Sequence, residues 1–472
     1  MSQNKALLIL LILLLSNFLI FGLVVPSKQS NNNELNSYKS FSKNILLSTS
    51  DSKYPQHVEP TLAIGQNNQL YVGWKNANYP NSGGLAVSFT TSNDNGSTWS
   101  NPIFMPSNIS NTLFQSDPWL NVHDNEIYYS YLDYSNFSSL NQISQVTMAK
   151  SIDNGSTWTT SKASDNNYFA DKETFIVSPN GTIYLTYDNI NVQTGLGSVK
   201  LSRSINNAVT FNDISRVNSL AFENILAPYP ALSSNGTLFV AWLKLNSNTN
   251  DNGDVYYAYS TDGGIKFSPE KDLNPETNFG ASIVYNYAPG ISTMPVIKFD
   301  SKDRLYILWT EHDKVWQVYL RYSDDFGIHW SKKIPVNAYT DKNQWEPDMA
   351  IDSKDNLHVV WYEETYNRYR PYYREISFTG ENRSTIIQSS VIPVASSFTS
   401  SDFTRPGDYC TIRVDSFDLP HVVWTDGRHG QFDIYYAHAS SDYPASSIPG
   451  FNLPLLVLPI AFYILLRKRK NF

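Results

Sequence analysis

A phrase of eight residues recurs along this chain about every 60 residues, and it constrains the fold more than any other feature. It reads SNDNGSTW from Ser92 to Trp99 and SIDNGSTW from Ser151 to Trp158. Looser copies run from Ser260 to Phe267 and from Ser323 to Trp330, and a decayed copy begins at Ser204. A unit that repeats at a fixed period and carries strand-like segments predicts a propeller or a solenoid.

Each residue type in the phrase suits a tight turn. An aspartate side chain accepts hydrogen bonds from nearby backbone N–H groups, glycine permits a positive φ, and the closing aromatic ring anchors the turn in the core. We predict this structural role, and no calcium loop, because the later acidic ligands of a calcium-binding hand are missing. The residues concerned are Asp94, Gly96, Trp99, Asp153, Gly155, Trp158, Asp262, Gly264, Phe267, Asp325, Gly327 and Trp330.

The phrase resembles the Asp-box, also called the bacterial neuraminidase repeat, whose pattern is S-x-D-x-G-x-T-W/F. The resemblance is to sialidase-like β-propellers and spans most of residues 42–440. In that family the boxes join the two outer strands of each blade, on the face opposite the active site. The resemblance therefore implies an all-β ring whose functional residues lie at the other face.

A second repeat sets the number of blades. Seven segments are near-continuous runs of β-branched and aromatic residues, which suit strands buried on both faces. These segments are Leu70–Trp74, Ile127–Tyr131, Ile183–Tyr187, Leu238–Trp242, Leu305–Trp309, Leu357–Trp361 and Pro420–Trp424. We predict a single propeller over residues 43–440 with seven four-stranded blades. Six blades, the number in sialidases, are the alternative.

Another strand is expected before each of these segments. Six of the seven predicted openings contain a proline, which is tolerated at the first residue of a strand because no ladder hydrogen bond is lost there. The predicted openings are Glu59-Pro60, Asp117-Pro118, Asp171, Pro230, Pro295, Glu346-Pro347 and Arg405-Pro406.

The chain pattern also predicts how the ring closes. The seventh unit ends after its third strand, at His438, and a spare strand precedes the first unit at Lys43–Ser48. We expect the spare strand to complete the last blade, since closure of this kind leaves only short edges.

The N-terminal segment is apolar. Residues Ala6–Val25 follow Lys5 and are typical of a signal peptide or a signal anchor, which we assign to residues 1–26. A Ser- and Asn-rich linker, residues 27–42, connects this segment to the propeller.

The C-terminal segment, residues 451–472, follows a second linker at residues 441–450. Its apolar run Asn452–Leu466 precedes four basic residues, a layout that fits a cytoplasmic end. The run beginning at Pro449-Gly450-Phe451 resembles archaeal C-terminal sorting signals, and a single-span anchor is the alternative. Both interpretations predict a propeller attached to the membrane at the outer cell surface.

The residues of the sialidase active site are largely missing. Sialidases bind a carboxylate with three arginines, one of them in an F/Y-R-I-P sequence, and use a Tyr–Glu nucleophile pair and an Asp acid/base. The matching position here reads His57-Val58-Glu59-Pro60, and the chain has no arginine before Arg203. Arg304 is expected on the opposite face. Only three arginines are expected near the axis: Arg405, Arg413 and Arg428.

Acidic residues are expected to gather around the axis instead. Crowded carboxylates raise one another's pKa or recruit a cation, so the group could form a Ca²⁺ site, a pocket for sugars or cationic groups, or the carboxylate pair of a glycoside hydrolase. Solvated rim residues are the alternative. The catalytic candidates are Asp117, Asp171, Glu346, Asp408 and Arg405, and the ligand-binding candidates here are Glu59, Asp348, Asp426, Arg428 and His429.

The segment after Trp361 interleaves tyrosines and arginines. Tyr366, Arg368 and Arg370 are candidates for stacking on sugar rings, because such residues are enriched in recognition surfaces. Packing within a long loop is the alternative.

The net charge of −8 disfavours nucleic-acid binding, since it would repel phosphate. We therefore expect a monomeric, surface-anchored propeller that recognises glycans or surface proteins without catalysis. The alternatives are a sialidase-type glycoside hydrolase and a structural scaffold.

Overall fold

The computed structural model describes residues 38, 40–48, 54–79, 83–109, 112–135, 144–165, 168–245, 253–275, 294–312, 314–366, 368–399 and 406–440. The predicted signal segment, the predicted C-terminal anchor and Arg405 lie outside these residues. Within the described residues, no helix has the length and apolar character needed to cross a membrane.

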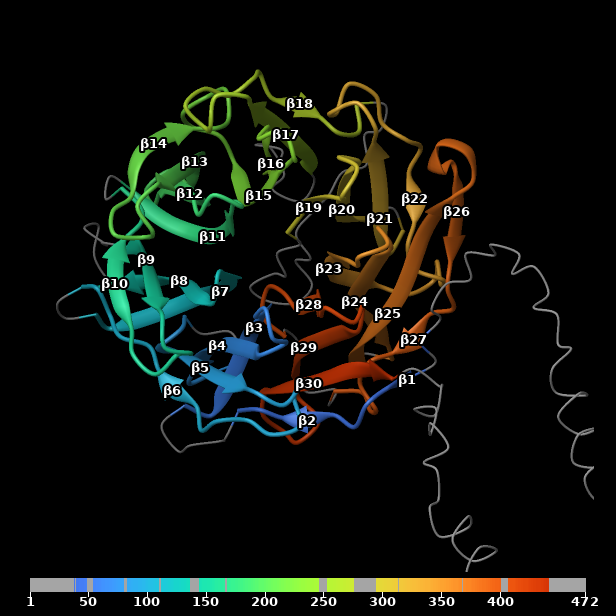
Figure 1. The fold of residues 1–472 in the computed structure, drawn as a ribbon, viewed down its shortest axis with the longest axis horizontal. Helices are drawn as coiled ribbons and strands as arrows, with labels where there is room; N and C mark the ends of the chain where they lie inside the picture. Colours follow the sequence, from blue (N-terminus) through green and yellow to red (C-terminus); the bar gives the residue numbers. More distant parts are fainter. Residues whose placement is uncertain are drawn as a thin grey trace, which may run out of the picture. The chain divides into compact units, whose positions relative to one another are not determined.

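Seven antiparallel sheets form a ring, so the protein is a seven-bladed β-propeller (Figure 1). In blades 1 to 3 the strands follow one another outward in chain order. They are β3 (Gln56–Ile64), β4 (Leu70–Ala77), β5 (Ala86–Ser92) and β6 (Ile103–Phe104); β7 (Phe114–His123), β8 (Glu126–Tyr134), β9 (Ser144–Ser151) and β10 (Thr159–Lys162); and β11 (Phe169–Val177), β12 (Ile183–Asn191), β13 (Leu196–Ser204) and β14 (Asn212–Arg216).

Blades 4 to 6 repeat the same order, and blade 6 has two short outer strands. Their strands are β15 (Ile225–Leu232), β16 (Leu238–Leu245), β17 (Gly253–Ser260) and β18 (Lys271–Asp272); β19 (Val296–Phe299), β20 (Leu305–His312), β21 (Trp316–Ser323) and β22 (Ile334–Pro335); and β23 (Gln344–Ile351), β24 (Leu357–Thr365), β25 (Arg368–Thr379), β26 (Thr385–Gln388) and β27 (Ile392–Pro393).

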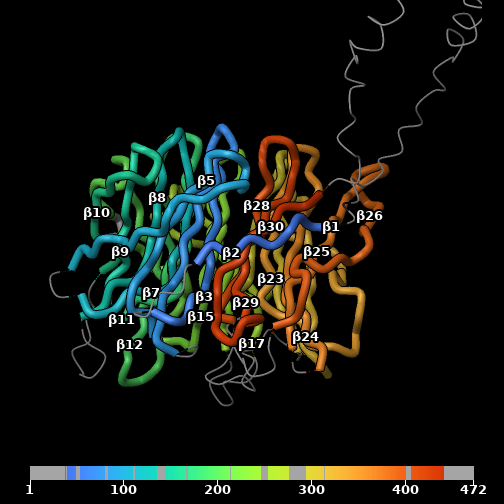
Figure 2. Tube along the Cα trace, turned by 90° about the horizontal axis from the view of Figure 1, so that it is seen from below, coloured from blue at the N-terminus to red at the C-terminus, as the bar shows by residue number. Residues whose placement is uncertain are grey.

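Blade 7 is completed by the N-terminal part of the chain, as predicted. Its strands β28 (Thr411–Val414), β29 (Pro420–Asp426) and β30 (Asp433–Ser440) pair in order, and β1 (Ser40–Phe41) and β2 (Ile45–Leu46) pair with β30. The first described strand of the chain thus lies beside the last (Figures 1 and 2). Closure by strands from opposite ends of the chain leaves blade 7 without a long open edge.

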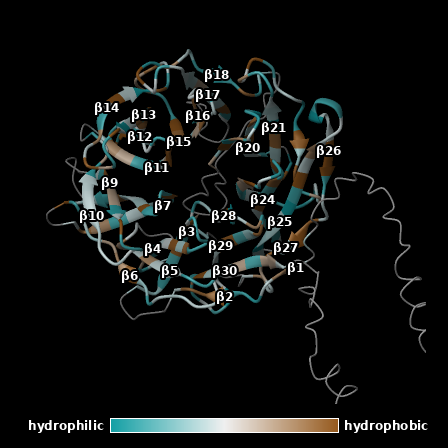
Figure 3. Cartoon of the chain, in the orientation of Figure 1, coloured by the Kyte–Doolittle hydropathy of each residue, from teal (hydrophilic) through white to brown (hydrophobic). Residues whose placement is uncertain are grey.

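The core lies between the blades. The second strand of each of the seven blades carries a tryptophan or tyrosine that is almost fully enclosed, such as Trp74, Trp242 and Trp424. Figure 3 shows hydrophobic residues along the strands of the ring, whereas many of the connections are hydrophilic. Large flat side chains fill the wedge between neighbouring sheets, which explains the 14% aromatic content.

The Asp-box turns form as predicted. In the first box, Asp94 accepts hydrogen bonds from the backbone N (2.8 Å) and the hydroxyl (2.6 Å) of Thr98, and these bonds lower the pKa of Asp94. Gly96 has φ of +83°, and the indole of Trp99 donates to the Gly96 carbonyl over 3.1 Å. The Trp99 ring packs edge-on against Tyr436 of blade 7, so the box also joins two blades.

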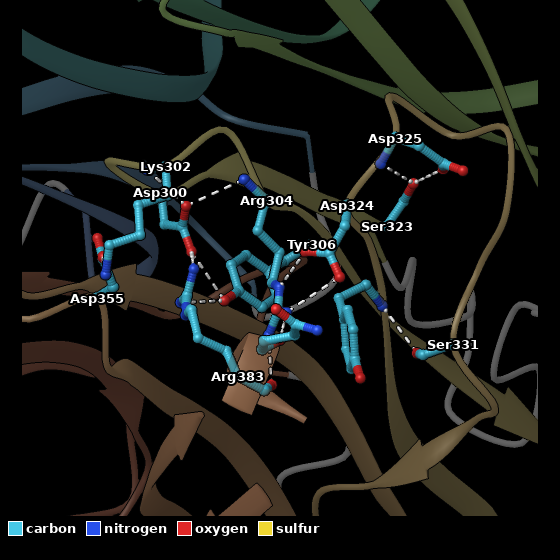
Figure 4. Close-up of polar contacts among 12 residues, drawn as sticks. Asp300, Lys302, Arg304, Tyr306, Ser323, Asp324, Asp325, Ser331, Asp355 and Arg383 are labelled. Atoms are coloured by element: carbon cyan, nitrogen blue, oxygen red, sulfur yellow. Dashed lines mark hydrogen bonds and ion pairs between the residues drawn. The ribbon is translucent and has the colours of Figure 1, made fainter. Parts of the chain in front are cut away.

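The box turns and the turns between the first and second strands lie at one end of the ring, which we call the Asp-box face. On this face Arg304, from the first turn of blade 5, donates to both oxygens of Asp324 (2.6 and 3.0 Å) (Figure 4). Its Nη1 also donates to the carbonyl of Arg383, and Arg383 pairs with Asp300 over 2.7 Å. Arg304 is therefore a structural link between blades 5 and 6, away from the other end, which we call the loop face.

The innermost strands differ from the prediction at their starts. They begin two or three residues before the Glu59-Pro60, Asp117-Pro118 and Glu346-Pro347 pairs, which lie inside β3, β7 and β23. The pairing register shifts at each pair, and the residue before the proline has a positive φ of 50–57°. The prolines therefore follow a β-bulge, where the ladder is already interrupted.

Candidate functional site

One residue of each blade lies in an equivalent position around the axis, and a β-bulge sets this position in β3, β7, β11, β15 and β23. The shared pairing register identifies these positions. In each second strand, the residue just before the recurring tryptophan or tyrosine pairs with a residue of the neighbouring innermost strand, and the layer contains the residue two positions before that partner. This first layer, nearest the loop face, contains Glu59, Asp117, Lys172, Ala227, Met294, Glu346 and Tyr409. Four of the seven positions carry a charged group.

Lys172 is the centre of the charged cluster. Its Nζ atom lies 2.7 Å from Asp117, 2.6 Å from Asp408 and 3.9 Å from Asp171. Asp117 and Asp408 are 5% and 2% exposed, and Lys172 is buried beside them. Two predicted catalytic carboxylates, Asp117 and Asp408, are thus brought together, and both contact the same ammonium group.

Two of the three carboxylates around Lys172, those of Asp117 and Asp171, have different proton affinities. Burial favours neutral Asp117, but Lys172 and Lys75 outweigh burial and lower its pKa. Burial raises the pKa of Asp171 to about 6, against the attraction of Lys172. Asp171 is also the most accessible of the three, with 24% of its side chain exposed. This cluster therefore contains one ionised buried carboxylate and one accessible carboxyl that titrates near neutral pH.

Glu59 forms a second buried pair in the same layer. Its Oε1 atom lies 2.5 Å from the Nζ of Lys75, and its side chain is enclosed. Burial raises the pKa of Glu59 to about 7 despite Lys75, and Asp117 and Asp408 contribute to the increase. Glu59 is therefore an internal group, and its predicted role as an accessible ligand-binding residue is not supported by its burial.

Glu346 and Asp348 of blade 6 are also buried. Glu346 belongs to the first layer, and its backbone carbonyl accepts a contact from the thiol of Cys410. Asp348 accepts from the Nη1 of Arg413 (2.8 Å) and from the backbone N of Ile412 (3.0 Å), so it ties blade 6 to blade 7. Arg413 lies near the axis, but two levels below the first layer, toward the Asp-box face.

The predicted patch in blade 7 is mostly structural. Asp426 accepts from the indole of Trp424 (2.9 Å) and from Arg428 (2.5 Å). Arg428 also donates to Asn44 beside the outermost strand, so it points to the outer part of the blade, and its predicted place near the axis is wrong. His429 is exposed at the turn tip.

The predicted Tyr/Arg loop is a tight hairpin instead. β24 extends to Thr365 and β25 starts at Arg368, because the alternating aromatic residues continue the ladder. Tyr366 at its tip is 94% exposed, and Arg368 is also exposed. Arg370 stacks on Phe398 at 4.2 Å, which makes it a packing residue.

Below the first layer, aromatic rings close the axis. The Trp119 ring meets Tyr229 and Tyr409 edge-on, with centroids 5.5 and 5.6 Å apart. The cavity that they line with Glu346 measures about 10 Å³, room for a single water molecule. This cavity is too small to hold a sugar ring.

Exposed aromatic side chains lie on the connections at the loop face. Tyr168 and Phe222 are 38% and 54% exposed and meet edge-on, with ring centroids 6.2 Å apart. Tyr168 precedes β11 and Phe222 precedes β15, so both lie at the loop face between blades 3 and 4. Tyr79, Tyr339 and Tyr366 are exposed on other connections at the same face.

Sequence reasoning missed the lysines of the site. In the sequence, Lys172 is one more charge in an acidic stretch, and Lys75 ends a buried run. Aligning the repeats on their aromatic residues would have placed Lys172 in line with Glu59, Asp117 and Glu346. No group of three or more His, Cys, Asp or Glu side chains within the described ranges is arranged to hold a metal ion.

Comparison with known proteins agrees with the fold. No protein-family model matches the chain, and no curated protein matches it. A polysaccharide lyase described as an ulvan lyase has a similar structure, with 13% identity, a TM-score of 0.51, and coverage of 81% of this chain and 94% of the lyase.

Two glycosidases are also similar in structure. An α-L-arabinofuranosidase of Fusarium graminearum has 11% identity and a TM-score of 0.48 over 84% of this chain and 97% of its own. A Hadza microbial sialidase has 13% identity and a TM-score of 0.49 over 68% of this chain and 66% of its own. At these identities the likeness concerns the fold.

Proposed function

We propose that the loop face recognises carbohydrates at a cell surface and does not cleave them. The observation that carries this proposal is the exposed aromatic pair Tyr168–Phe222 at the loop face, where the central carboxylates Asp117, Asp408 and Glu59 are buried and paired with lysines. Aromatic side chains offer large rigid faces at low conformational-entropy cost, and such residues dominate recognition surfaces. The exposed Tyr366 and Arg368 would extend the same surface on blade 6.

The carboxylates near the axis favour binding over hydrolysis. A glycoside hydrolase needs two carboxyl groups that flank the scissile bond with room for the sugar between them. Asp117 and Asp408 both contact one ammonium group and are buried, so neither faces such a space.

The similar ulvan lyase structure supports carbohydrate as the ligand class. The structure of that protein contains a bound saccharide, and we propose only the general ligand class, carbohydrate, for the present chain.

We also propose a membrane-attached arrangement with the loop face outward. Ser40 pairs with Ser440, so the described chain starts and ends side by side at the Asp-box end of blade 7. The apolar segments 6–25 and 452–466 lie beyond these two positions in the sequence. Attachment through either segment would leave the loop face free to meet ligands.

Glycoside hydrolysis is the second candidate, and one observation favours it. Asp171 and Asp117 are adjacent carboxyls whose pKa values are shifted in opposite directions, the pattern of an acid and an ionised partner. Hydrolysis would require turnover that Asp171→Asn abolishes without loss of folding.

The test of the binding proposal compares two exposed phenylalanines at opposite faces. Full-length protein is applied to an array of immobilised glycans, together with Phe222→Ala and the control Phe417→Ala, whose ring is 75% exposed at the Asp-box face. We expect binding to fall at least tenfold in Phe222→Ala only. Equal binding by both variants, or no binding by the folded wild type, would contradict the proposal.

A further inference from the structure

A second cavity opens on the axis at the Asp-box face. It measures about 330 Å³ and is lined by the last residues of five innermost strands. This volume lies within the range of small-molecule sites. The aromatic rings of Trp119 and Tyr229 lie between this cavity and the charged cluster of the loop face, so the two are separate sites.

The shape of the cavity follows from the residues in one layer of the innermost strands. Trp119 and Tyr229 belong to one layer of the innermost strands. Two residues further along these strands, toward the Asp-box face, the next layer includes three alanines, Ala63, Ala231 and Ala350, whose small side chains leave space at the axis. The same layer carries Lys298 in blade 5 and Arg413 in blade 7. The two cations therefore flank Ala350 of blade 6 across an open volume.

Lys298 has no ion pair or hydrogen bond with any residue of the described ranges. Its Nζ atom lies 5.6 Å from the centre of the Tyr229 ring. Burial, with a contribution from Arg413, lowers the pKa of Lys298 to about 8, against the attraction of Asp348. The Lys298 side chain is half-buried and still mainly charged at pH 7, so an ammonium group without an ion-pair partner among the described residues lines the cavity.

Arg413 is only partly compensated. Its Nη1 donates to Asp348 (2.8 Å) and to the carbonyl of Ile412 (2.6 Å), and its guanidinium lies 5.6 Å from the Trp119 ring centre. Within the described ranges, Asp348 is the carboxylate that pairs with Arg413. Two cations and one anion leave the cavity with a net positive charge.

We propose that this cavity binds a small oxyanion between Lys298 and Arg413. A carboxylate, sulfate or phosphate group would give Lys298 the partner it lacks, and the planar guanidinium suits such groups. The site lies at the opposite end of the ring from the proposed carbohydrate surface and goes beyond that function. The oxyanion could be a free inorganic ion or the acid group of a sugar.

The test is calorimetric titration of the full-length protein with sodium sulfate, sodium phosphate and sodium glucuronate at constant ionic strength. Lys298→Met removes the ammonium, and Lys266→Met removes an exposed lysine from the same face as a control. We expect one saturable site, weakened at least tenfold in Lys298→Met and unchanged in Lys266→Met. Tighter binding of glucuronate than of sulfate identifies the acidic sugar as ligand, and the reverse order identifies the free ion.

A second variant guards against a folding defect in the first. Ala350→Ile retains both cations but fills the space between them, so it should also abolish binding. No saturable binding of any of the three anions by the wild type would overturn the proposal, as would unchanged binding in Lys298→Met. Failure of the carbohydrate proposal would instead appear in Phe222→Ala, which leaves this cavity intact.

Discussion

The Nζ atom of Lys172 in blade 3 lies 2.7 Å from Oδ2 of Asp117 in blade 2, so an ion pair joins the innermost strands of two neighbouring blades. The same ammonium lies 2.6 Å from Asp408, which precedes the first strand of blade 7. One buried lysine thereby links three blades around the axis. Lys172 lies in the β-bulge of β11 and has a left-handed φ of 50°.

Lys172→Met should strongly destabilise the fold. The change leaves two buried carboxylates without their counter-ion, and breaking a buried pair in this way costs about 3–5 kcal/mol. Urea denaturation followed by tryptophan fluorescence measures the loss. Lys162→Met, at an exposed position of β10, serves as the control and should change the free energy of unfolding by less than about 0.5 kcal/mol. Similar values for both variants would show that the cluster does not stabilise the ring.

Glu59 should make stability depend on pH. Its pKa rises from 4.5 to about 7 on folding, mainly through burial, so the folded state binds a proton that the unfolded state releases. The stabilising contribution is complete below pH 4.5 and is lost as the pH rises through about 7. The free energy of unfolding of the wild type, measured relative to that of Glu59→Gln, should therefore decrease as the pH rises from 4.5 to 7.

Asp153 provides the opposite dependence for comparison. Hydrogen bonds from Thr157 lower its pKa to about 2, so its contribution is present above pH 3.8 and is lost as the pH falls toward 2. The difference between wild type and Asp153→Asn should shrink on acidification. For each variant, the free energy of unfolding relative to wild type is followed against pH. If this difference changed with pH in the same direction for Glu59→Gln and Asp153→Asn, the account of the two carboxyls would be contradicted.

Ring closure should depend on Leu47, which follows β2. Leu47 is 5% exposed and its backbone N donates to Ile434, whereas its neighbour Leu46 is 48% exposed. Leu47→Ala should cost about 2–5 kcal/mol through the cavity left behind. Leu46→Ala should cost little, and thermal unfolding of the two variants measures the difference. Equal melting temperatures would mean that the N-terminal strand contributes little to blade 7.

Two glycines separate backbone strain from crowding. Gly96 and Gly181 both have a positive φ, near 80°, so alanine at either position should cost about 1–2 kcal/mol. A Cβ atom on Gly96 would also lie 2.3 Å from the hydroxyl of Tyr436, whereas nothing lies within 4 Å at Gly181. Gly96→Ala should therefore be the more destabilising change in chemical denaturation. The reverse order would show that the Asp-box turn does not pack against blade 7 as described.

The sequence predicts the frame of the protein well. The turn of the first Asp-box can be predicted from local sequence, because the residues that form it, Asp94, Gly96 and Trp99, lie within a few positions of one another. The seven aromatic runs each mark a second strand, and the spare strand at Lys43–Ser48 accounts for the missing strand of blade 7. These features depend on local patterns and on counting repeats.

The interior of the site depends on relations that local patterns do not contain. A positive φ at a non-glycine residue such as Asp117 has no clear signal beyond the proline that follows it. The pairing of Lys172 with Asp408 joins residues more than 200 positions apart in the sequence. Charge patterns predicted an acidic axis, whereas the ring geometry brings lysines to the same carboxylates.

The most direct test of the central claim combines binding with analysis of the bound sugar. Full-length protein is incubated with the glycans that it retains on an array, and the recovered glycans are examined by mass spectrometry after prolonged contact. The account predicts saturable binding that Phe222→Ala weakens and glycans of unchanged mass. Shortened glycans whose appearance requires Asp171 would contradict it and would make this propeller a hydrolase.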